Sequence, residues 1–316
     1  MSSRFHVPSA VAIVAACLLG VRCGGGSTST SPTPQPPITI PGDPTGGTGT
    51  TPSGTGPRIF AGAGDIAMCP VLDPAYATGR LLASMGATVF TLGDNAYDHG
   101  TAAEFRNCYD PTWGSFKAYT FPVVGNHEFE GNVDPFPYYD YFGANAGPRG
   151  QGWYSHEVGD WHAIALNSNL PITPNSAQGV WLANDLATHP AKCTIAYWHH
   201  PLFTSGQNGP QTQMKQVYQF LYDKGVDIVL NGHDHLYERF APQDADGRRD
   251  DARGIREFIV GTGGALLYDF VTQAPNSQVR IKAFGILKLT LTSNAYDWQF
   301  IRVDGGLGDS GQGVCH

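Results

Sequence analysis

A short apolar run followed by a histidine-rich turn constrains the fold of this chain more than any other stretch. Residues 226–230 read Val-Asp-Ile-Val-Leu, which is typical of a buried strand, and they lead into Asn231-Gly-His-Asp-His235. The two histidines of this turn, His233 and His235, follow the strand at i, i+2 spacing. We expect their side chains to reach different points of one site at the end of the strand.

Four other predicted strand ends carry polar residues of the same kind. They are Gly64-Asp65, Gly93-Asp94-Asn95-Ala96-Tyr97, Gly125-Asn126-His127-Glu128 and Trp198-His199-His200-Pro201. A single Asp or His at a strand end is usually a cap or a polar core group, so the metal interpretation depends on the whole ordered set. Because ligands of α/β sheets bind beyond the carboxyl ends of the strands, the five stretches are predicted to meet in one place.

Together these five stretches resemble the metallophosphoesterase superfamily, and Tyr97 narrows the resemblance to the purple acid phosphatases. The resemblance extends from about Arg58 to Val303 and implies a bacterial enzyme with a single catalytic domain. The implied fold is α/β, a four-layer α/β/β/α sandwich of two mixed sheets. The alternation of strands and helices between residues 58 and 126 also favours a layered α/β sandwich. The family's first block is usually Asp-x-Gly, whereas this chain has Asp65-Ile66-Ala67.

The resemblance also assigns metal ligands. A two-metal hydrolase holds its ions about 3.5–4 Å apart and needs a group that bridges them; by resemblance that group is Asp94. The first ion would be bound by Asp65, Asp94, Tyr97 and His235, and the second by Asp94, Asn126, His199 and His233. A metal-bound hydroxide would attack phosphorus in line. His127 would protonate the leaving group, oriented by Glu128, with His200 as the alternative acid.

The tyrosine indicates which metals to expect. A metal-bound tyrosine is a phenolate, so Asp65, Asp94 and Tyr97 would together contribute three negative charges. The third negative charge offsets the additional positive charge of a trivalent ion. A trivalent and a divalent ion bound by these three residues therefore have the same net charge as two divalent ions bound by two aspartates. The set therefore indicates Fe(III) at the first position, with Fe(II), Zn or Mn at the second.

Composition limits the class of protein and its partners. The chain has 316 residues, of which 41% are hydrophobic, enough for the core of one large domain. Its 19 Lys+Arg and 27 Asp+Glu give a net charge of -8, which argues against nucleic-acid binding by bulk charge. The expected partner is a small phosphorylated substrate, and a membrane would be contacted only through an N-terminal lipid.

The N-terminal part predicts export. Residues 1–23 resemble a signal peptide, in which Cys17 and Cys23 are alternative lipidation sites and a signal without lipid is the third possibility. Residues 24–57 are almost entirely Gly, Ser, Thr and Pro and are predicted to be a disordered linker. The catalytic domain would span residues 58–316, and the protein would be secreted, periplasmic or lipid-anchored to the cell envelope.

Four cysteines remain outside the signal region: Cys69, Cys108, Cys193 and Cys315. Four cysteines allow three disulfide pairings, and export favours their oxidation. We favour Cys69 with Cys108, because both follow early stretches of the predicted site. That leaves Cys193 with Cys315, which would fasten the C-terminal tail.

The leading functional hypothesis is a secreted phosphatase that hydrolyses phosphate monoesters. One alternative is a phosphodiesterase or nucleotidase that uses the same site, because substrate choice depends on the loops 98–110, 132–150 and 204–210. Another is a non-catalytic surface binding protein, although such a protein has no need of seven metal-binding side chains.

Overall fold

The computed structural model describes residues 56–129 and 136–316. The predicted signal segment 1–23 and nearly all of the predicted linker 24–57 lie outside these ranges. Among the helices of the two described ranges, none combines the length and the apolar character that a membrane span requires.

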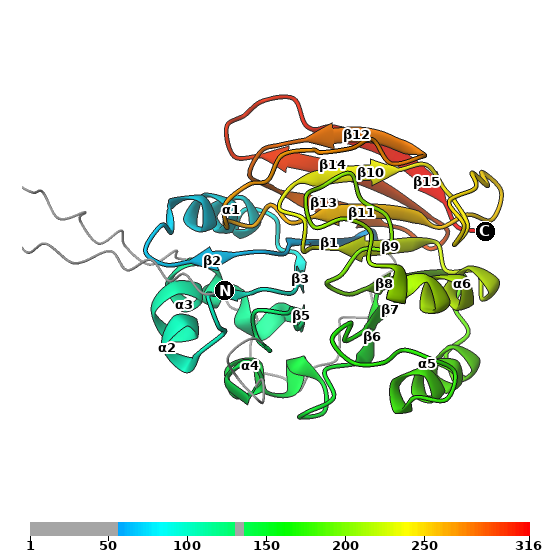
Figure 1. Ribbon diagram of the computed structural model, residues 1–316, viewed down its shortest axis with the longest axis horizontal. Helices are drawn as coiled ribbons and strands as arrows, with labels where there is room; N and C mark the ends of the chain where they lie inside the picture. Colours follow the sequence, from blue (N-terminus) through cyan, green and yellow to red (C-terminus); the bar gives the residue numbers. More distant parts are fainter. Residues whose placement is uncertain (1–55, 130–135) are drawn as a thin grey trace, which may run out of the picture. The chain divides into compact units, whose positions relative to one another are not determined.

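Two mixed β-sheets form the centre of the domain (Figure 1). The first sheet has six strands in the order β15-β14-β13-β1-β3-β5, in which β1 runs parallel to β3 and antiparallel to β13. Its strands are β1 (Arg58–Ala63), β3 (Thr88–Leu92), β5 (Thr120–Val123), β13 (Gly285–Leu291), β14 (Ala295–Arg302) and β15 (Asp309–Val314). A separate pair, β2 (Ala67–Met68) and β4 (Ala96–Tyr97), lies beyond the ends of β1 and β3 in the chain.

The second sheet has seven strands in the order β12-β10-β11-β9-β8-β7-β6. Its strands are β6 (Tyr154–Val158), β7 (Trp161–Ala165), β8 (Cys193–Tyr197), β9 (Ile228–Asn231), β10 (Tyr237–Phe240), β11 (Arg256–Val260) and β12 (Ser277–Ile281). The four strands β7, β8, β9 and β11 are parallel to their neighbours in that series, so their carboxyl ends share one edge. Two pairs of consecutive strands, β6–β7 and β13–β14, are antiparallel hairpins.

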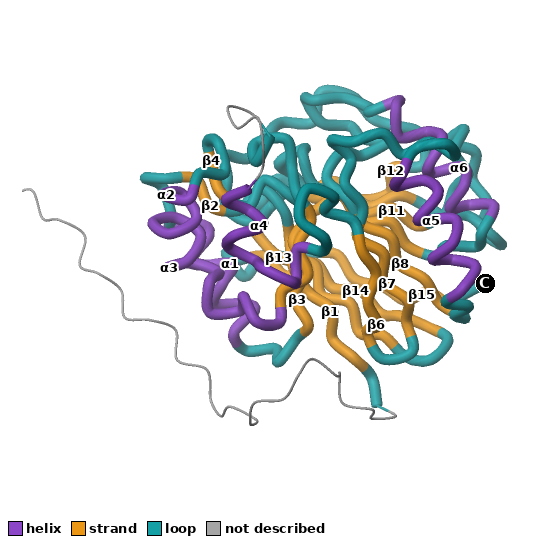
Figure 2. Tube along the Cα trace, turned by 90° about the horizontal axis from the view of Figure 1, so that it is seen from below, coloured by secondary structure: helices purple, strands orange, loops and turns teal. Residues whose placement is uncertain are grey.

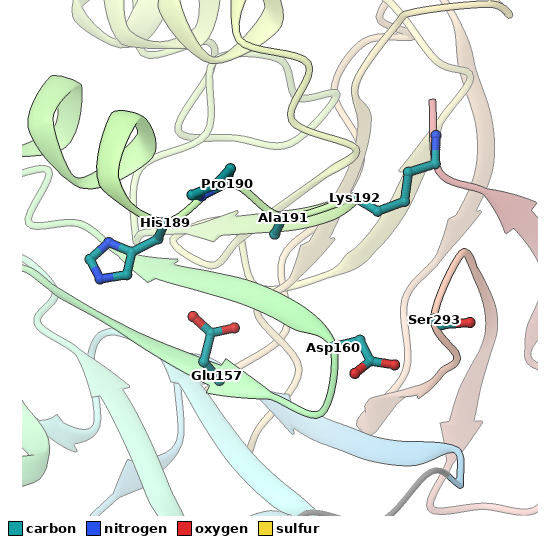
Figure 3. Close-up of a pocket in the computed structure, with 7 residues that line it drawn as sticks. All are labelled: Glu157, Asp160, His189, Pro190, Ala191, Lys192 and Ser293. Atoms are coloured by element: carbon teal, nitrogen blue, oxygen red, sulfur yellow. The ribbon is translucent and has the colours of Figure 1, made fainter.

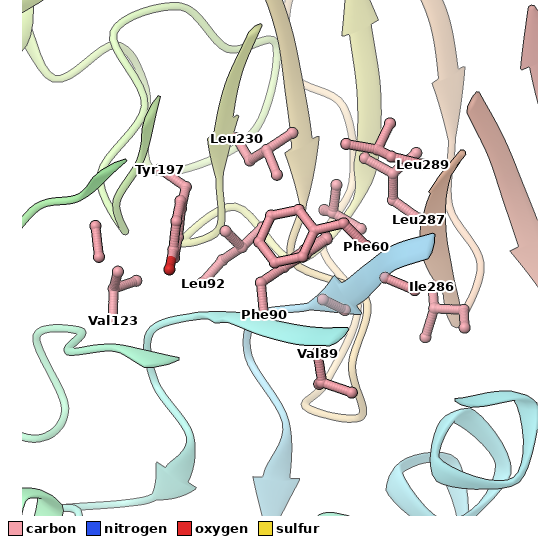
Figure 4. Close-up of a cluster of buried hydrophobic side chains, with 14 of the residues drawn as sticks. Phe60, Val89, Phe90, Leu92, Val123, Tyr197, Leu230, Ile286, Leu287 and Leu289 are labelled. Carbon is pink, nitrogen blue, oxygen red and sulfur yellow. The ribbon is translucent and has the colours of Figure 1, made fainter. Parts of the chain in front are cut away.

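The sheets pack face to face across a shared hydrophobic core (Figure 4). Successive residues of a strand point to opposite faces, and β8 shows the consequence. Its residue Tyr197 belongs to the core between the sheets together with Phe60 and Leu230. The neighbouring Ala196 lies instead in a second core, under the helices on the outer face.

Helices cover the outer faces (Figure 2). Leu182 of α5 and Val217 and Leu221 of α6 pack in the outer core of the second sheet, and α1 packs beside β13 of the first sheet. The α-helices are α1 (Asp73–Ala83), α2 (Ala102–Glu104), α3 (Asp110–Trp113), α4 (Phe136–Phe142), α5 (Ala177–Thr188) and α6 (Lys215–Asp223). The expected α/β/β/α sandwich of two mixed sheets is confirmed.

Residues 98–110, expected to be a loop, are helical over more than half their length. Thr101 and Glu104 form a capping box in which the Thr101 side chain accepts from the Glu104 amide and the Glu104 carboxylate from the Thr101 amide. This box starts α2, which continues through a π-helical turn, η1 (Phe105–Tyr109), into α3. The remaining helical turns are 3-10: η2 (Gly114–Tyr119), η3 (Gly143–Ala146) and η4 (Thr212–Met214).

Two disulfides join distant parts of the domain. Cys69 pairs with Cys108 and Cys193 pairs with Cys315, which is the pairing favoured from the sequence. The first links the residue after β2 to the π-helical turn η1. The second spans 122 residues and fastens the end of the chain to the start of β8.

A buried histidine in β7, His162, connects the second sheet to the helix α5 that covers it. The Nδ1 atom of His162 lies 2.8 Å from Glu157 Oε1, and its Nε2 atom lies 2.8 Å from Asp185 Oδ2 of α5. Burial alone would lower the pKa of His162, but the two carboxylates outweigh it and raise the pKa to about 9 from an ordinary value of 6.5. The folded protein therefore holds a proton that the unfolded chain releases above about pH 6.5.

We expect the free energy of unfolding to fall as the pH rises from about 6.5 to 9. The contribution of protonated His162 is complete below its unfolded pKa and disappears above its folded pKa, a loss of about 3 kcal/mol. The variant His162→Gln, which can hydrogen-bond but does not titrate, should show a flatter profile in urea unfolding measured at several pH values. The same pH dependence in parent and variant would contradict the assignment.

Candidate metal centre

The predicted site residues follow strands whose carboxyl ends meet. In the first sheet, parallel β1, β3 and β5 lead into Asp65, Asp94 and Asn126. In the second, parallel β8 and β9 lead into His199 and His233. Because the sheets are packed together, all five residues gather at one end of the sandwich, as expected for ligands beyond parallel strands.

One group of side chains surrounds the hydroxyl of Tyr97. Its oxygen lies 2.9 Å from Asp65 Oδ1, 3.1 Å from Asp94 Oδ2 and 3.1 Å from His235 Nε2. In addition, His235 Nε2 lies 3.2 Å from Asp65 Oδ1. These four residues are the set that the sequence assigned to the first ion.

A second group surrounds His199. Its Nε2 atom lies 3.1 Å from Asp94 Oδ2, 3.0 Å from Asn126 Oδ1 and 3.2 Å from His233 Nδ1. These four residues are the set assigned to the second ion. The Asp94 Oδ2 atom belongs to both groups, so one carboxylate oxygen lies between them.

The donor atoms suit two metal ions. Two ligands that each lie about 2.1 Å from an ion, at right angles, are about 3 Å apart, and the spacings of 2.9–3.2 Å in the cluster agree with this value. Carboxylate, phenol, amide and imidazole donors together suit iron, manganese or zinc. Asp65 and Asp94 are buried, and two buried carboxylates require a compensating positive charge.

Backbone carbonyls orient two of the imidazoles. His199 Nδ1 lies 2.7 Å from the carbonyl oxygen of Leu92, and His235 Nδ1 lies 2.7 Å from that of Leu266. A carbonyl oxygen can only accept a hydrogen bond, so Nδ1 of each ring carries the proton. The Nε2 lone pair of each ring is then available to a metal ion on the side of the cluster.

The electrostatics of the protein alone show what a cation would change. Burial lowers the pKa of His199, but Asp94 outweighs it and raises the pKa to about 9. Burial, followed by the charges of Asp65 and Asp94, raises the pKa of Tyr97 well above 10. Without a cation the Tyr97 phenol therefore keeps its proton, and a phenolate at this position requires a strongly charged ion beside it.

The loops that carry these ligands have an uncommon backbone conformation. Asp65, Asp94 and His233 have φ values of 59°, 49° and 71°, in the left-handed region that residues other than glycine seldom adopt. Such conformations persist where surrounding contacts fix them, often at functional sites. Gly125 belongs to the same set of loops, because a Cβ atom there would lie 2.1 Å from Asp94 Oδ1.

Glu128 fixes these loops. From the sequence we expected it to orient His127, whereas its carboxylate is bonded to backbone amides. Its buried carboxylate accepts hydrogen bonds from the backbone amides of Gly125 at 2.7 Å, Asp94 at 3.1 Å and Asn95 at 2.6 Å. It therefore ties the loop after β5 to the loop after β3. A carboxylate can accept several bonds at once, and the two loops together present three backbone donors to it.

His127 is oriented by other groups. Its Nδ1 atom lies 2.7 Å from the carbonyl oxygen of Asp98, and its amide donates to Asp94 Oδ1 at 2.9 Å. The ring packs against Tyr97 with centroids 4.4 Å apart, and Nε2 lies 3.9 Å from Asp94 Oδ2. The imidazole is thus partly exposed at the rim of the cluster.

Some residues of the site carried no signal in the sequence. The ring of Tyr268 stacks on His235 at 4.0 Å, and Thr204 donates to Asp234 at 2.6 Å, between the two histidines of the central turn. Both come from loops without a recognisable pattern. The family pattern has a glycine where this chain has Ala67. The structure accommodates the alanine, because Ala67 is the first residue of β2 and the residue with a positive φ in this loop is Asp65.

A separate hollow lies at the other end of β8 from His199 (Figure 3). Its volume is about 510 Å³, and it is lined by Glu157, Asp160, His189, Pro190, Ala191, Lys192 and Ser293. None of the seven predicted metal ligands lines it, and neither does His127. It is therefore not part of the cluster described above.

The two-sheet sandwich and the double ligand group together define the metallophosphoesterase class of proteins. The sequence profile of the family described as Calcineurin-like phosphoesterase matches residues 65–237, which include the seven predicted metal ligands and His127. The chain belongs to the calcineurin-like phosphoesterase family.

Individual relatives point to one branch of this family. The chain is 29% identical to the probable purple acid phosphatase 20 of Arabidopsis thaliana over 242 residues, 68% of this chain and 54% of the relative. It is also 29% identical to purple acid phosphatase 21 of the same plant, over 74% of this chain and 57% of the relative. The chain thus spans little more than half the length of these relatives.

Solved structures support the fold. A purple acid phosphatase from yellow lupin seeds superposes with a TM-score of 0.68 at 21% identity, over 83% of this chain and 54% of the lupin chain. GAP50 of Plasmodium, described as the anchor in the inner membrane complex, gives a TM-score of 0.61 at 15% identity, over 83% and 90%. At these identities the similarity shows a shared fold and nothing about activity.

Proposed function

We propose that this chain is a phosphoric ester hydrolase that uses two metal ions and acts on phosphate monoesters. The observation that carries the proposal is the position of Asp94 Oδ2, which lies 3.1 Å from both the Tyr97 oxygen and His199 Nε2. One carboxylate oxygen therefore belongs to two ligand groups, which is the arrangement that two bridged ions need. The similarity to purple acid phosphatases supports the same activity.

The group around Tyr97 would hold Fe(III), and the group around His199 would hold Fe(II), Zn or Mn. When bound, the ions would supply Lewis-acid activation of a phosphoryl group and of water. The protein's own part is to hold the ligands in place. Glu128 fixes the loops of Asp94 and Asn126, and the Leu92 and Leu266 carbonyls fix the two imidazoles.

His127 is proposed to give a proton to the leaving group. With Nδ1 directed to the Asp98 carbonyl, the ring presents Nε2 toward Asp94 at the rim of the cluster. A general acid must lie within reach of the oxygen that it protonates. From this position the imidazole can meet the leaving oxygen of an ester held at the cluster.

We further propose that the protein is exported. Both disulfides lie in the described domain, and disulfides persist mainly in oxidising compartments. Residues 1–23 would act as the signal and residues 24–57 as a linker to the domain 58–316. Mature protein from its own host should then lack residues 1–16, which mass spectrometry of the N-terminus would show.

An assay of the purified full chain, loaded with metal, tests the proposed activity. We expect turnover of an aryl phosphate monoester, slower turnover of the corresponding bis-aryl diester, and loss of both after chelation. Faster turnover of the diester would favour the phosphodiesterase alternative. A protein that holds two ions and hydrolyses neither ester would instead be a binding protein.

A further inference from the structure

A third histidine, His200, lies beside the second ligand group and differs from the others in its hydrogen bonds. Its ring centroid is 4.5 Å from that of His233 and 4.9 Å from that of His199. One ring nitrogen of each of the three lies within 4.8 Å of the other two. Proximity alone would therefore allow His200 to be a further metal ligand.

The residue is held rigidly. Its amide donates to Ser168 Oγ at 3.2 Å, its carbonyl accepts from Trp198 Nε1 at 2.7 Å, and its Nδ1 atom lies 2.7 Å from Ser168 Oγ. Trp198 and Ser168 are buried. A side chain fixed in this way can bind a ligand in one orientation at a low entropic cost, because little rotamer entropy remains to be lost on binding.

The hydroxyl of Ser168 determines which nitrogen of His200 carries the proton. Ser168 Oγ already accepts from the His200 amide, and among the described residues its hydroxyl proton has no acceptor other than His200 Nδ1. A buried hydroxyl proton without an acceptor is costly, so Ser168 donates to Nδ1. Neutral His200 then carries its proton on Nε2.

This is the opposite tautomer to that of His199 and His235. Those rings face carbonyl oxygens through Nδ1 and turn an Nε2 lone pair to the cluster. The Nε2 atom of His200 bears a hydrogen and so cannot ligate an ion. In the described part of the chain it has no protein partner, and the side chain is partly exposed.

We propose that His200 is a fixed hydrogen-bond donor that binds a phosphoryl oxygen of the substrate, with Ser168 as the residue that sets its tautomer. This inference rests on the proposed function for the nature of the substrate. The chemistry concerned is that of a tetrahedral oxyanion with several equivalent acceptor oxygens. The ring of His200 lies 4.5 Å from that of His233, so an anion held beside His233 would also lie beside His200.

The test uses the metal-loaded full chain and inorganic phosphate as the probe. In His200→Leu we expect phosphate to bind about tenfold more weakly in calorimetry, the usual cost of losing a hydrogen bond to a charged group. KM for the monoester should rise more than kcat falls, and both ions should remain bound. His200→Gln, which retains a donor, should recover part of the affinity.

Two further variants separate this role from a structural one. Ser168→Ala should weaken phosphate binding less than His200→Leu, and the double variant should be no weaker than His200→Leu alone, because the two residues act as a unit. His189→Gln, a histidine at the end of α5 lining the separate hollow, is the matched control and should leave phosphate binding unchanged.

Unchanged phosphate affinity in His200→Leu would overturn the inference, and so would loss of an ion in that variant, which would make His200 a ligand. Failure of the parent to bind phosphate at all would also overturn it. If the parent hydrolyses no ester but binds phosphate in a manner that depends on His200, the proposed activity is wrong and this inference stands. If the parent hydrolyses the monoester and His200→Leu keeps the parental phosphate affinity and KM, the proposed activity stands and this inference is wrong.

Discussion

Replacing Asp94 by Asn should remove at least one metal ion and lower kcat/KM by a factor of about 10² or more. The His127 amide donates to Asp94 Oδ1 at 2.9 Å, so the new amide should place its oxygen there. Its NH2 group would then occupy the Oδ2 position that both ligand groups share. A hydrogen-bond donor at that position repels cations, and metal ions supply several kcal/mol of transition-state stabilisation.

Metal analysis of the purified variant and steady-state kinetics would measure both effects. Asp140→Asn is a suitable control, because Asp140 is an exposed aspartate that pairs with Arg149 on the surface. An Asp94→Asn protein that retains two ions and parental kinetics would show that Asp94 does not bridge them.

The second large effect is expected from Tyr97→Phe. If Tyr97 binds Fe(III) as a phenolate, the oxidised parent should absorb visible light by charge transfer from the tyrosinate, and the variant should lose this band completely. The change also removes one negative charge from the first group. Because burial and two aspartates oppose ionisation of Tyr97, only a highly charged ion can stabilise its phenolate, so the variant should shift toward two divalent ions.

Visible spectra and metal content would be compared after growth with iron available. Activity can persist in altered form, since divalent ions alone can support phosphoryl chemistry. A variant with the parental spectrum and metal content would show that Tyr97 is not a ligand. A colourless and fully active parent without iron would leave a phosphoesterase with two divalent ions.

The sequence predicted the parts of this fold that depend on local pattern. The runs that became β8 and β9 are apolar on both faces, because helices cover one face and the other sheet covers the second. Their polar ends identified the candidate ligand residues, since the parallel arrangement brings those ends together. The start of α5 is likewise local, because the side chain of Ser176 accepts from the Gly179 amide and caps the helix.

The remaining features depend on contacts between distant residues. Strand β15 contains two glycines and a mostly exposed surface, and it exists because it pairs with β14. The roles of Glu128 and Ser168 could not be predicted either. Each depends on which backbone amides or imidazole the folded chain places beside it, and the sequence contains no short-range pattern for such contacts.

The disulfide between Cys193 and Cys315 determines what a single proteolytic cut does to the protein. The covalent loop that it closes contains His199, His233 and His235, and it also contains exposed turns such as residues 251–253 and the strongly exposed Leu307. A single cut in any of these turns leaves both fragments joined through sulfur. A nicked molecule would therefore keep its C-terminal fragment, which carries β15, attached to the fragment with these three imidazoles until a reductant separates the two.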